Sequence, residues 1–255
     1  MKSTVFVRAD GGGRMGWGHL VRSSALAGKL RGAGWRVVYL VRDSDAAAVR
    51  QLKRRFEVIR LRRELGEGSL PSGVAPGAWV ILDRYGIGAD RQAAIKAAGA
   101  RLLCIDDLNE SRFHADVVVN GHLGAERMKY SADPSTRLLL GGRYALLRPE
   151  FHLAPRARKF PASARRVLVT FGGSDPEGLT ARICRILKSL SLDLRISAVM
   201  GPSASSKRLA PAVKEVRNAS ARTMRRLMES ADAVVCAPGV TCLELARLGV
   251  PTAVL

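Results

Sequence analysis

The order of elements along the chain constrains the fold most strongly, because one sequence theme occurs in both halves. In the first half, a β-branched strand at residues 4–8 is followed by a glycine-rich turn and by a helical pattern that opens at His19. In the second half, a strand at residues 166–171 is followed by the same kind of turn and by another helix. Strands that alternate with helices are typical of βαβ units in a parallel sheet. We therefore predict an α/β protein with two Rossmann-like, doubly wound domains.

The periodicity of apolar residues predicts the elements of each half. The first half is expected to hold strands at 4–8, 36–41, 57–61, 79–83, 101–105 and 117–120, and helices at 19–31, 46–55 and 89–98. The second half is expected to hold strands at 166–171, 194–200, 233–236 and 252–255, and helices at 177–190, 205–216, 223–230 and 240–248. Residues 65–77 contain glycines and prolines and are expected to form a surface loop.

A polar, basic and proline-containing segment at residues 151–164 separates the two halves and is predicted to be a linker. The expected domains are therefore residues 1–150 and residues 165–255. The chain stops within a strand pattern, directly after Gly249-Val250-Pro251, where a parallel sheet would normally continue. We expect the second domain to lack its final strands and helices.

The net charge of +20 permits attraction to nucleic acid or to an acidic membrane. The basic residues are scattered among the predicted helices, however, and aromatic residues make up only 5% of the chain, with no basic–aromatic interleaving. We expect a solvated basic surface that steers an anionic substrate, and no specific nucleic-acid partner. Nucleic-acid binding stays the alternative.

The sequence gives little indication of a membrane helix, a metal site or disulfide bonds. No window approaches the roughly 18 uncharged apolar residues of a membrane helix, and no signal peptide is evident, so a cytoplasmic protein is expected. The histidines show no ligand spacing, so neither a metal nor another cofactor is expected. The cysteines, Cys104, Cys184, Cys236 and Cys242, have no C-x-x-C spacing and are expected to be reduced and buried. Because Cys236 and Cys242 flank a predicted loop, a place near a ligand is the alternative for them.

The glycine-rich turn after the first strand is the first candidate site. Gly16 and Gly18 let a ligand approach the backbone closely, and the helix start offers unpaired N–H groups to an anion. Arg8, Asp10 and His19 stand beside this turn, at a strand end where open α/β sheets bind ligands. The positive helix end favours an uncharged imidazole, which could act as a general base. The alternative is structural: His19 caps the helix and Arg8 pairs with Asp10.

A turn in the second half is a candidate anion site. Gly172 and Gly173 expose backbone N–H groups, Ser174 or Asp175 can cap the following helix, and Pro176 suits its first turn. An ordinary βα turn without a ligand is the alternative.

A second turn of this kind leads from Gly239 and Val240 into a helix. Thr241 can cap that helix or donate a hydrogen bond to a phosphate, and Glu244, on the same helix face, could accept hydrogen bonds from ribose hydroxyls. A capping box of the Thr-x-x-Glu type explains the same two residues structurally.

Carboxylates end two further apolar strands of the first half. Asp83 ends one of them, with Tyr85 close behind, and Asp106 and Asp107 follow the other. Neighbouring acids point in different directions, so Asp106 and Asp107 need not form a catalytic pair. A single acid could orient His19 or hold sugar hydroxyls, and helix capping or turn formation is the alternative.

These candidates occur in one order along almost the whole chain. The motifs are Arg8, Asp10, Gly16, Gly18, His19 and Arg22; Asp83, Tyr85, Gly86 and Ile87; Asp106 and Asp107; Asn120; residues 141–151; Gly172 to Pro176; and Gly239 with Glu244. In this order they resemble the UDP-sugar hydrolases of pseudaminic acid biosynthesis. Related spore-coat polysaccharide proteins share much of the pattern.

The resemblance implies a fold and a reaction. It implies the two-domain GT-B architecture of glycosyltransferases, with water as the acceptor. The implied reaction releases UDP from UDP-2,4-diacetamido-2,4,6-trideoxy-β-L-altropyranose, with inversion at the anomeric carbon and without a metal. The implied partner is a UDP-sugar, and a monomer is expected.

The resemblance also implies residue roles. His19 aligns with the proposed general base of the family and Tyr85 with an active-site tyrosine, and Asp83 stands beside them as a catalytic candidate. The first domain would bind the sugar through Arg8, Asp10, Gly16, Gly18, Arg22, Asp106, Asp107, Asn120 and Tyr144. The second domain would bind UDP through Gly172, Gly173, Ser174, Asp175, Gly239, Val240, Thr241 and Glu244.

The sequence departs from the family pattern in ways that concern the sugar. Arg84 stands where a histidine is often found, and Thr241-Cys242 replaces a more polar segment. Two other functions stay open. One is a GT-B glycosyltransferase that passes a nucleotide sugar to an acceptor. The other is a catalytically inactive, basic protein that binds nucleic acid or acts as a scaffold.

Overall fold

The computed structural model describes residues 3–67, 70, 74–155, 157, 161–204 and 208–255. The chain divides into two compact units. The first consists of Met1–Gly11 and Arg22–Leu146, and the second consists of Gly12–Val21 and Leu147–Leu255. The short segment Gly12–Val21, which holds His19, is thus grouped with the carboxyl-terminal half of the chain.

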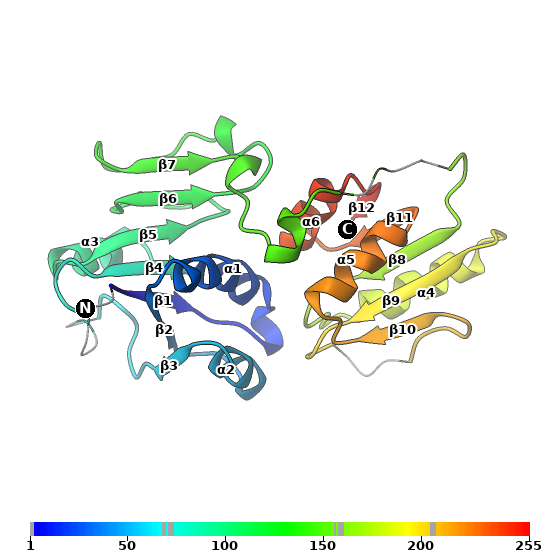
Figure 1. Ribbon diagram of the computed structural model, residues 1–255, viewed down its shortest axis with the longest axis horizontal. Helices are drawn as coiled ribbons and strands as arrows, with labels where there is room; N and C mark the ends of the chain where they lie inside the picture. Colours follow the sequence, from blue (N-terminus) through cyan, green and yellow to red (C-terminus); the bar gives the residue numbers. More distant parts are fainter. Residues whose placement is uncertain (1–2, 68–69, 71–73, 156, 158–160, 205–207) are drawn as a thin grey trace. The chain divides into compact units, whose positions relative to one another are not determined.

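The first unit is built on a seven-stranded parallel sheet with the order β3-β2-β1-β4-β5-β6-β7 (Figure 1). Its strands are β1 (Thr4–Ala9), β2 (Arg36–Val41), β3 (Glu57–Arg60), β4 (Trp79–Asp83), β5 (Arg101–Ile105), β6 (Val117–Asn120) and β7 (Arg137–Leu140). The order reverses between β1 and β4. At such a reversal, open α/β sheets bind ligands outside the carboxyl ends of the strands.

Helices connect these strands and begin and end at residues that suit a helix boundary. They are α1 (Gly18–Gly32), α2 (Ala46–Lys53) and α3 (Ala89–Ala97), with the 3-10 turns η2 (Ala125–Arg127) and η3 (Gly142–Tyr144). The 3-10 turn η1 (Gly13–Met15) and the first turn of α1 lie in the segment Gly12–Val21, which belongs to the second unit. The carboxylate of Asp45 accepts a hydrogen bond of 2.7 Å from the Ala48 N–H and so caps α2. After α1 the chain turns at Gly34, whose φ of 91° favours glycine.

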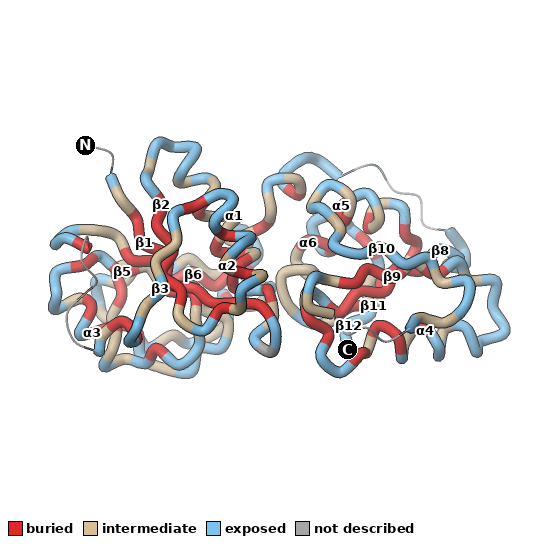
Figure 2. The backbone as a smooth tube through the Cα atoms, turned by 90° about the horizontal axis from the view of Figure 1, so that it is seen from below, coloured by how far each residue is buried: buried red, intermediate tan, exposed pale blue. Residues whose placement is uncertain are grey.

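The core of the first unit lies along its central strands. Phe6, Val38, Leu82, Leu102 and Val118, each from a different strand, belong to one cluster of buried apolar side chains. Figure 2 shows buried residues running along the strands, whereas the helices carry exposed residues on their outer sides. Strands covered on both faces read as near-continuous apolar runs, which is why they were visible in the sequence.

The second unit contains a five-stranded parallel sheet with the order β10-β9-β8-β11-β12. Its elements are η4 (Pro149–His152), β8 (Arg166–Thr170), α4 (Leu179–Ser189), β9 (Arg195–Met200), β10 (Lys214–Arg217), α5 (Ala221–Ser230), β11 (Ala233–Cys236), α6 (Val240–Leu248) and β12 (Thr252–Val254). The order reverses between β8 and β11, so this sheet has the same doubly wound pattern. The predicted fold class, two doubly wound α/β sheets, is confirmed.

Some predicted elements are wrong. The helix expected at 205–216 is not formed in its described part, where residues 208–213 are irregular and Lys214–Arg217 forms β10 beside β9. Pro211 interrupts the helical pattern there, and a proline inside a helix removes a hydrogen bond and clashes with the preceding turn. The strand β7 was not predicted. The expected surface loop at 65–77 buries Leu65 and Val74 in the core, and residues 68–69 and 71–73 of it lie outside the described part.

Gly121 offers a test of the packing at the end of β6. A Cβ atom at this position would lie 2.5 Å from the Cα of Ala145 and 2.8 Å from the carbonyl oxygen of Tyr144. We expect Gly121→Ala to lower the free energy of unfolding by about 1–3 kcal/mol, because the obstacle is backbone that cannot rotate away. Urea unfolding measures the change.

The matched control is Gly32→Ala in α1, where a Cβ would meet nothing within 4 Å. Alanine is the better helix former, so this substitution is expected to be neutral or to stabilise by up to about 1 kcal/mol. Equal stability of the two variants would contradict the packing described for Gly121.

Candidate functional site

The first polar cluster lies where β1 ends, beside the reversal of strand order. β1 and β4 are paired so that Arg8 lies opposite Leu82 and Ala9 opposite Asp83. Arg8, Asp10 and Asp83 are completely buried at this edge of the sheet. Buried charges are tolerated only when they are paired, so their partners decide what they can do.

Arg8 is held by two carboxylates. Its Nε and Nη2 atoms donate to the two carboxylate oxygens of Glu64, both at 2.6 Å, and its Nη1 atom donates to Asp10 at 2.6 Å. This is the structural alternative that the sequence left open for Arg8 and Asp10. Arg84 approaches from the surface and donates to the same oxygen of Asp10 at 2.6 Å. Asp10 thus lies between two guanidinium groups.

The other carboxylate oxygen of Asp10 fixes the chain after β2. It accepts hydrogen bonds from the backbone N–H groups of Arg42, Asp43 and Ser44 and from the Ser44 hydroxyl, at 2.7–3.1 Å. Burial by itself would raise the pKa of Asp10, but the charge of Arg8 and the hydrogen bonds from Ser44 and Arg42 outweigh it and lower the pKa to about 2. In this structure Asp10 therefore fastens the loop between β2 and α2.

A second cluster joins α1 to the ends of β4 and β5. Arg22 donates to Asp83 through Nε at 2.9 Å and through Nη2 at 2.7 Å, and to Asp107 through Nη1 at 2.8 Å. The hydroxyl of Tyr85 donates to the same Asp107 oxygen at 2.8 Å. Burial, together with the hydrogen bond to Asp107 and its charge, raises the pKa of Tyr85 to about 12. The phenol therefore stays protonated near neutral pH and acts as a hydrogen-bond donor.

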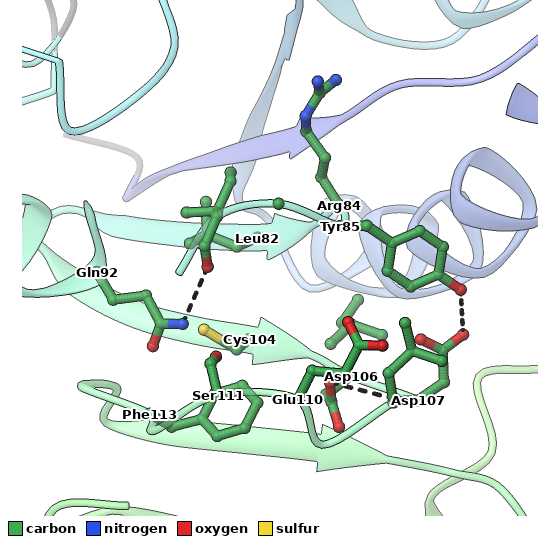
Figure 3. A pocket seen from close by; sticks show the side chains of 14 residues that line it. Leu82, Arg84, Tyr85, Gln92, Cys104, Asp106, Asp107, Glu110, Ser111 and Phe113 are labelled. Atoms are coloured by element: carbon green, nitrogen blue, oxygen red, sulfur yellow. Dashed lines mark hydrogen bonds between the residues drawn. The ribbon is translucent and has the colours of Figure 1, made fainter. Parts of the chain in front are cut away.

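A pocket opens beside this second cluster, between the ends of β4 and β5 (Figure 3). In Figure 3 Tyr85 and Asp107 face each other, whereas Arg84 points away from them toward the first cluster. The pocket encloses about 70 Å³. Pockets for drug-sized ligands enclose roughly 300–1,000 Å³, so this one has room for one part of a sugar rather than for a nucleotide sugar.

Asp106 and Asp107 point to different partners, as the sequence predicted. Asp106 accepts a hydrogen bond of 2.6 Å from the hydroxyl of Tyr130. That hydroxyl in turn accepts one of 2.8 Å from the side chain of Asn120, which is fully buried at the end of β6. Tyr144, at the end of η3, lies with its ring 5.6 Å from the Arg143 guanidinium.

The glycine loop before α1 is closed on itself. Gly12 and Gly16 exchange two backbone hydrogen bonds, of 2.8 and 3.0 Å, and the φ of Gly16 is 79°. Trp17 is buried, and its indole N–H donates to the hydroxyl of Ser203 at 3.2 Å. His19, the second residue of α1, is also buried. Because the N–H groups of Gly12 and Gly16 are used within the loop, this part of it is not an open anion cradle.

The turn after β8 has a packing reason for its second glycine. A Cβ on Gly173 would lie 2.1 Å from the ring of Trp17, and a Cβ on Gly201 would lie 2.3 Å from the Cα of Gly173. The carboxylate of Asp175 accepts hydrogen bonds from the N–H groups of Leu179 and Thr180, at 2.8 and 3.1 Å. The start of α4 is thus occupied by the chain's own carboxylate.

The turn after β11 is different, because α6 begins at Val240 without a capping side chain. Gly239, with a φ of 136°, is its N-cap residue and supplies no side-chain hydrogen bond. The Thr241–Glu244 capping box, which was the structural alternative to ligand binding by these two residues, is therefore not formed. Of the two predicted anion sites, the start of α6 is the less obstructed.

Glu244 is buried and bound to an arginine that the sequence analysis did not single out. Arg148 donates to its two carboxylate oxygens at 2.7 and 2.6 Å. Burial raises the pKa of Glu244, and the charge and hydrogen bonds of Arg148 oppose that rise. This ion pair ties the start of η4 to α6.

The cysteines are free thiols, and Cys104, Cys184 and Cys236 are buried, whereas Cys242 is partly exposed. In the part of the chain that the structure describes, no group of three or more histidine, cysteine or carboxylate side chains is placed to hold a metal ion. Within the same residues, no helix is both long and apolar enough to cross a membrane.

Several residues of these clusters were not singled out as site residues from the sequence, among them Glu64, Tyr130, Trp17 and Arg148. Glu64 and Tyr130 come from segments without a motif, whereas Trp17 and Arg148 lie inside quoted motifs and were given no role. The structure joins Arg22, Asp83, Tyr85 and Asp107 in one cluster, and Asp106 with Asn120 in another. It binds Arg8 and Asp10 to each other.

Comparison with known proteins finds two similar sequences. No family model matches the chain. An uncharacterized protein, MJ1062 of Methanocaldococcus jannaschii, is 28% identical over 98% of this chain, and the spore coat polysaccharide biosynthesis protein SpsG of Bacillus subtilis is also 28% identical over 98%. The alignment spans 55% of MJ1062 and 76% of SpsG, so the chain covers about half the length of the first relative.

Solved structures share the fold at low identity. MurG of Acinetobacter baumannii superposes with a TM-score of 0.57, at 17% identity, over 98% of this chain and 77% of its own. The calicheamicin glycosyltransferase CalG4 superposes with a TM-score of 0.60, at 14% identity, over 100% of this chain and 80% of its own. Anabaena HepE, in complex with UDP-glucose, superposes with a TM-score of 0.59, at 13% identity, over 98% of this chain and 80% of its own. The chain has the two-domain GT-B fold of glycosyltransferases.

The hydrogen bonds of Asp10 predict an acid-dependent loss of stability. The pKa of Asp10 is lowered by folding, so its contribution is complete above the unfolded value of about 3.9 and is lost as the pH falls toward about 2. At neutral pH, Asp10→Asn is expected to cost about 3–5 kcal/mol of unfolding free energy. Below about pH 4 the difference between the protein and this variant should shrink, which urea unfolding from pH 2 to 7 measures.

Asp43→Asn is the matched control, because Asp43 also pairs with Arg84 but is 42% exposed at its side chain. An exposed ion pair contributes about 1 kcal/mol or less. A difference between Asp10→Asn and the protein that stays constant from pH 2 to 7 would rule out the assigned pKa shift.

The pair Arg148–Glu244 predicts strong coupling between two positions. Arg148→Met is expected to cost about 3–5 kcal/mol, because it leaves the carboxylate of Glu244 buried without its partner. The double variant Arg148→Met/Glu244→Met should be more stable than the single variant, since the buried charge is then gone. Thermal or urea unfolding of the two single variants and the double variant gives the coupling energy.

Arg36→Met is the matched control, because it removes an ion pair of the same length that is exposed instead of buried. Arg36 pairs with Glu57 at the same 2.6 Å, but the side chains are 59% and 46% exposed. Its loss should cost less than about 1 kcal/mol. A coupling energy near zero for Arg148 and Glu244 would show that burial does not make this pair important.

Proposed function

We propose that this chain acts on nucleotide sugars as an enzyme. The proposal is supported by the GT-B fold, by the likeness to SpsG, whose name places it in polysaccharide biosynthesis, and by HepE, whose structure holds UDP-glucose. Within this class we propose a hydrolase. It would cleave the bond between UDP and a 2,4-diacetamido-2,4,6-trideoxyhexose with inversion, and would supply the free sugar for pseudaminic acid biosynthesis.

One observation carries this proposal: the cluster of Arg22, Asp83, Asp107 and Tyr85 beside a small pocket between the ends of β4 and β5, next to the reversal of strand order between β1 and β4. Open α/β sheets bind ligands at this position. The hydroxyl oxygen of the half-exposed Tyr85 and the carboxylate of Asp107 offer acceptors to the hydroxyl and amide N–H groups of a sugar. Arg22 would hold both carboxylates in place.

The chemistry needs a base and a site for the leaving group. In the proposed step, His19 takes a proton from water while the water oxygen attacks the anomeric carbon. The bond from that carbon to the phosphate oxygen breaks, and its electron pair leaves with UDP. Because a diphosphate is already a good leaving group, the need for a general acid is smaller than in most glycoside hydrolysis.

The negative charge that develops on UDP needs backbone N–H groups and a helix start. We assign this role to Gly239, Val240 and Thr241 at the start of α6, because the chain itself supplies no capping side chain there. Gly172, Gly173 and Ser174 are the second candidates, next to a helix whose start Asp175 occupies. Glu244 stays the candidate for the ribose, and this role would require it to loosen from Arg148.

A glycosyltransferase is the second candidate function, and the fold shared with MurG and CalG4 favours it. Such an enzyme would hold the nucleotide sugar in the same way but would pass the sugar to an acceptor hydroxyl. The two candidates differ in whether water alone suffices as the acceptor.

The test is release of UDP from the diacetamido-trideoxyhexose nucleotide without any added acceptor. We expect rapid release by the protein, and a decrease of about 100-fold or more in turnover for His19→Asn, because the base that activates water is lost. Affinity for UDP, measured by thermal shift, should be unchanged in this variant.

His152→Asn is the matched control, since His152 is exposed and its ring contacts the Leu147 carbonyl instead of the proposed site. Normal turnover of His19→Asn would remove His19 from the base role. No release without an acceptor, with release when a hydroxyl acceptor is present, would favour the transferase.

A further inference from the structure

Two thiols lie in contact at the turn between β11 and α6. The Sγ atoms of Cys236 and Cys242 are 3.5 Å apart. A disulfide bond needs about 2.05 Å between its sulfur atoms, so the pair is one short movement from bonding distance. The other two cysteines, Cys104 and Cys184, are buried in the separate cores of the first and second units.

The fold brings this pair together for a simple reason. Cys236 is the last residue of β11 and is fixed between Thr170 of β8 and Val254 of β12. Cys242 is in the first turn of α6, and the turn at Gly239 directs that helix back past the end of the strand. The Cys242 thiol also donates to the carbonyl oxygen of Ala237, at 3.2 Å, which holds it over the turn.

The two thiols differ in access. Cys236 has no exposed surface, whereas Cys242 is partly exposed. Burial, and then the neighbouring Cys242, raise the pKa of Cys236 to about 12. Cys242 lies in the first turn of α6 and is the one of these two thiols that has exposed surface. An external reagent therefore meets Cys242 first.

We propose that Cys236 and Cys242 form a reversible disulfide in the folded protein, with a low-molecular-weight disulfide such as oxidised glutathione as the oxidant. The Cys242 thiolate attacks one sulfur of the oxidant, and one glutathione thiol leaves. The Cys236 thiol then loses its proton and attacks the sulfur of Cys242 in this mixed disulfide, and the second glutathione thiol leaves. In sum, two protein thiols are oxidised to one disulfide, and one glutathione disulfide is reduced to two thiols.

The bond would close the turn that carries Gly239. An effect of this disulfide on UDP binding rests on the proposed function, which assigns the start of α6 to the leaving group. Formation of the disulfide itself does not rest on the proposed function. Failure of the disulfide leaves the proposed function standing, and a protein that releases no UDP can still form the bond.

The experiment treats the full chain, first reduced and then freed of reductant, with oxidised glutathione under native conditions. Both cysteines lie in one tryptic peptide, residues 227–247, which contains no other cysteine. We expect this peptide to lose the mass of two hydrogen atoms and to regain it with dithiothreitol. The peptides that contain Cys104 and Cys184 should stay unmodified. An unchanged peptide, or one that keeps a glutathione group, would overturn the proposal.

Two variants test the order of attack. Cys236→Ala should keep glutathione on Cys242, because the resolving thiol is absent. Cys242→Ala should take up glutathione at least about ten-fold more slowly, because the remaining thiol is buried and protonated. Thermal melting before treatment shows whether each variant is folded. Equal uptake by two folded variants would contradict the assigned roles.

Discussion

An arginine removed from water must be surrounded by acceptors, and the first unit is organised around one such residue. Arg8 lies fully buried at the end of its central strand, held by Glu64 and Asp10. Asp10 in turn binds three consecutive backbone N–H groups after β2. The position of that loop therefore depends on a charge pair. The same physical solution recurs at Asp83 with Arg22, and in the second unit at Glu244 with Arg148.

The two units use the same topological position for different chemistry. In the first unit the strand ends beside the reversal carry carboxylates, arginine and tyrosine, which suit the hydroxyl and amide groups of a sugar. In the second unit they carry glycines and helix starts, which suit a phosphate. Only one of the two helix starts is capped by the chain itself, through Asp175. The start of α6 is therefore the one of these two that no side chain caps.

Much of the fold could be predicted, because strands covered on both faces appear as apolar runs and because glycine turns separate them. The carboxylates at strand ends, Asp83 and Asp107, could be found in the same way. Arg22 was predicted as a site residue, but its pairing with these carboxylates was not, since a pair formed across more than sixty residues leaves no local signal. Pro211 is a signal against a helix, and the prediction of a helix at 205–216 did not take it into account. Arg148 lies inside a motif that was quoted from the sequence. Its role could not be predicted, because its buried partner Glu244 lies 96 residues further along the chain.

The buried ion pairs have a consequence for any attempt to engineer the charge of +20. Some arginines that reach the solvent bind carboxylates that are buried: Arg84 binds Asp10, Arg148 binds Glu244 and Arg166 binds Asp232. A protein redesigned for lower affinity to polyanions could lose many of its surface arginines at little expense, but not these. These few arginines contribute to the positive charge of the surface and also neutralise carboxylates in the interior. Changing them to improve solubility would therefore also lower the stability of the fold.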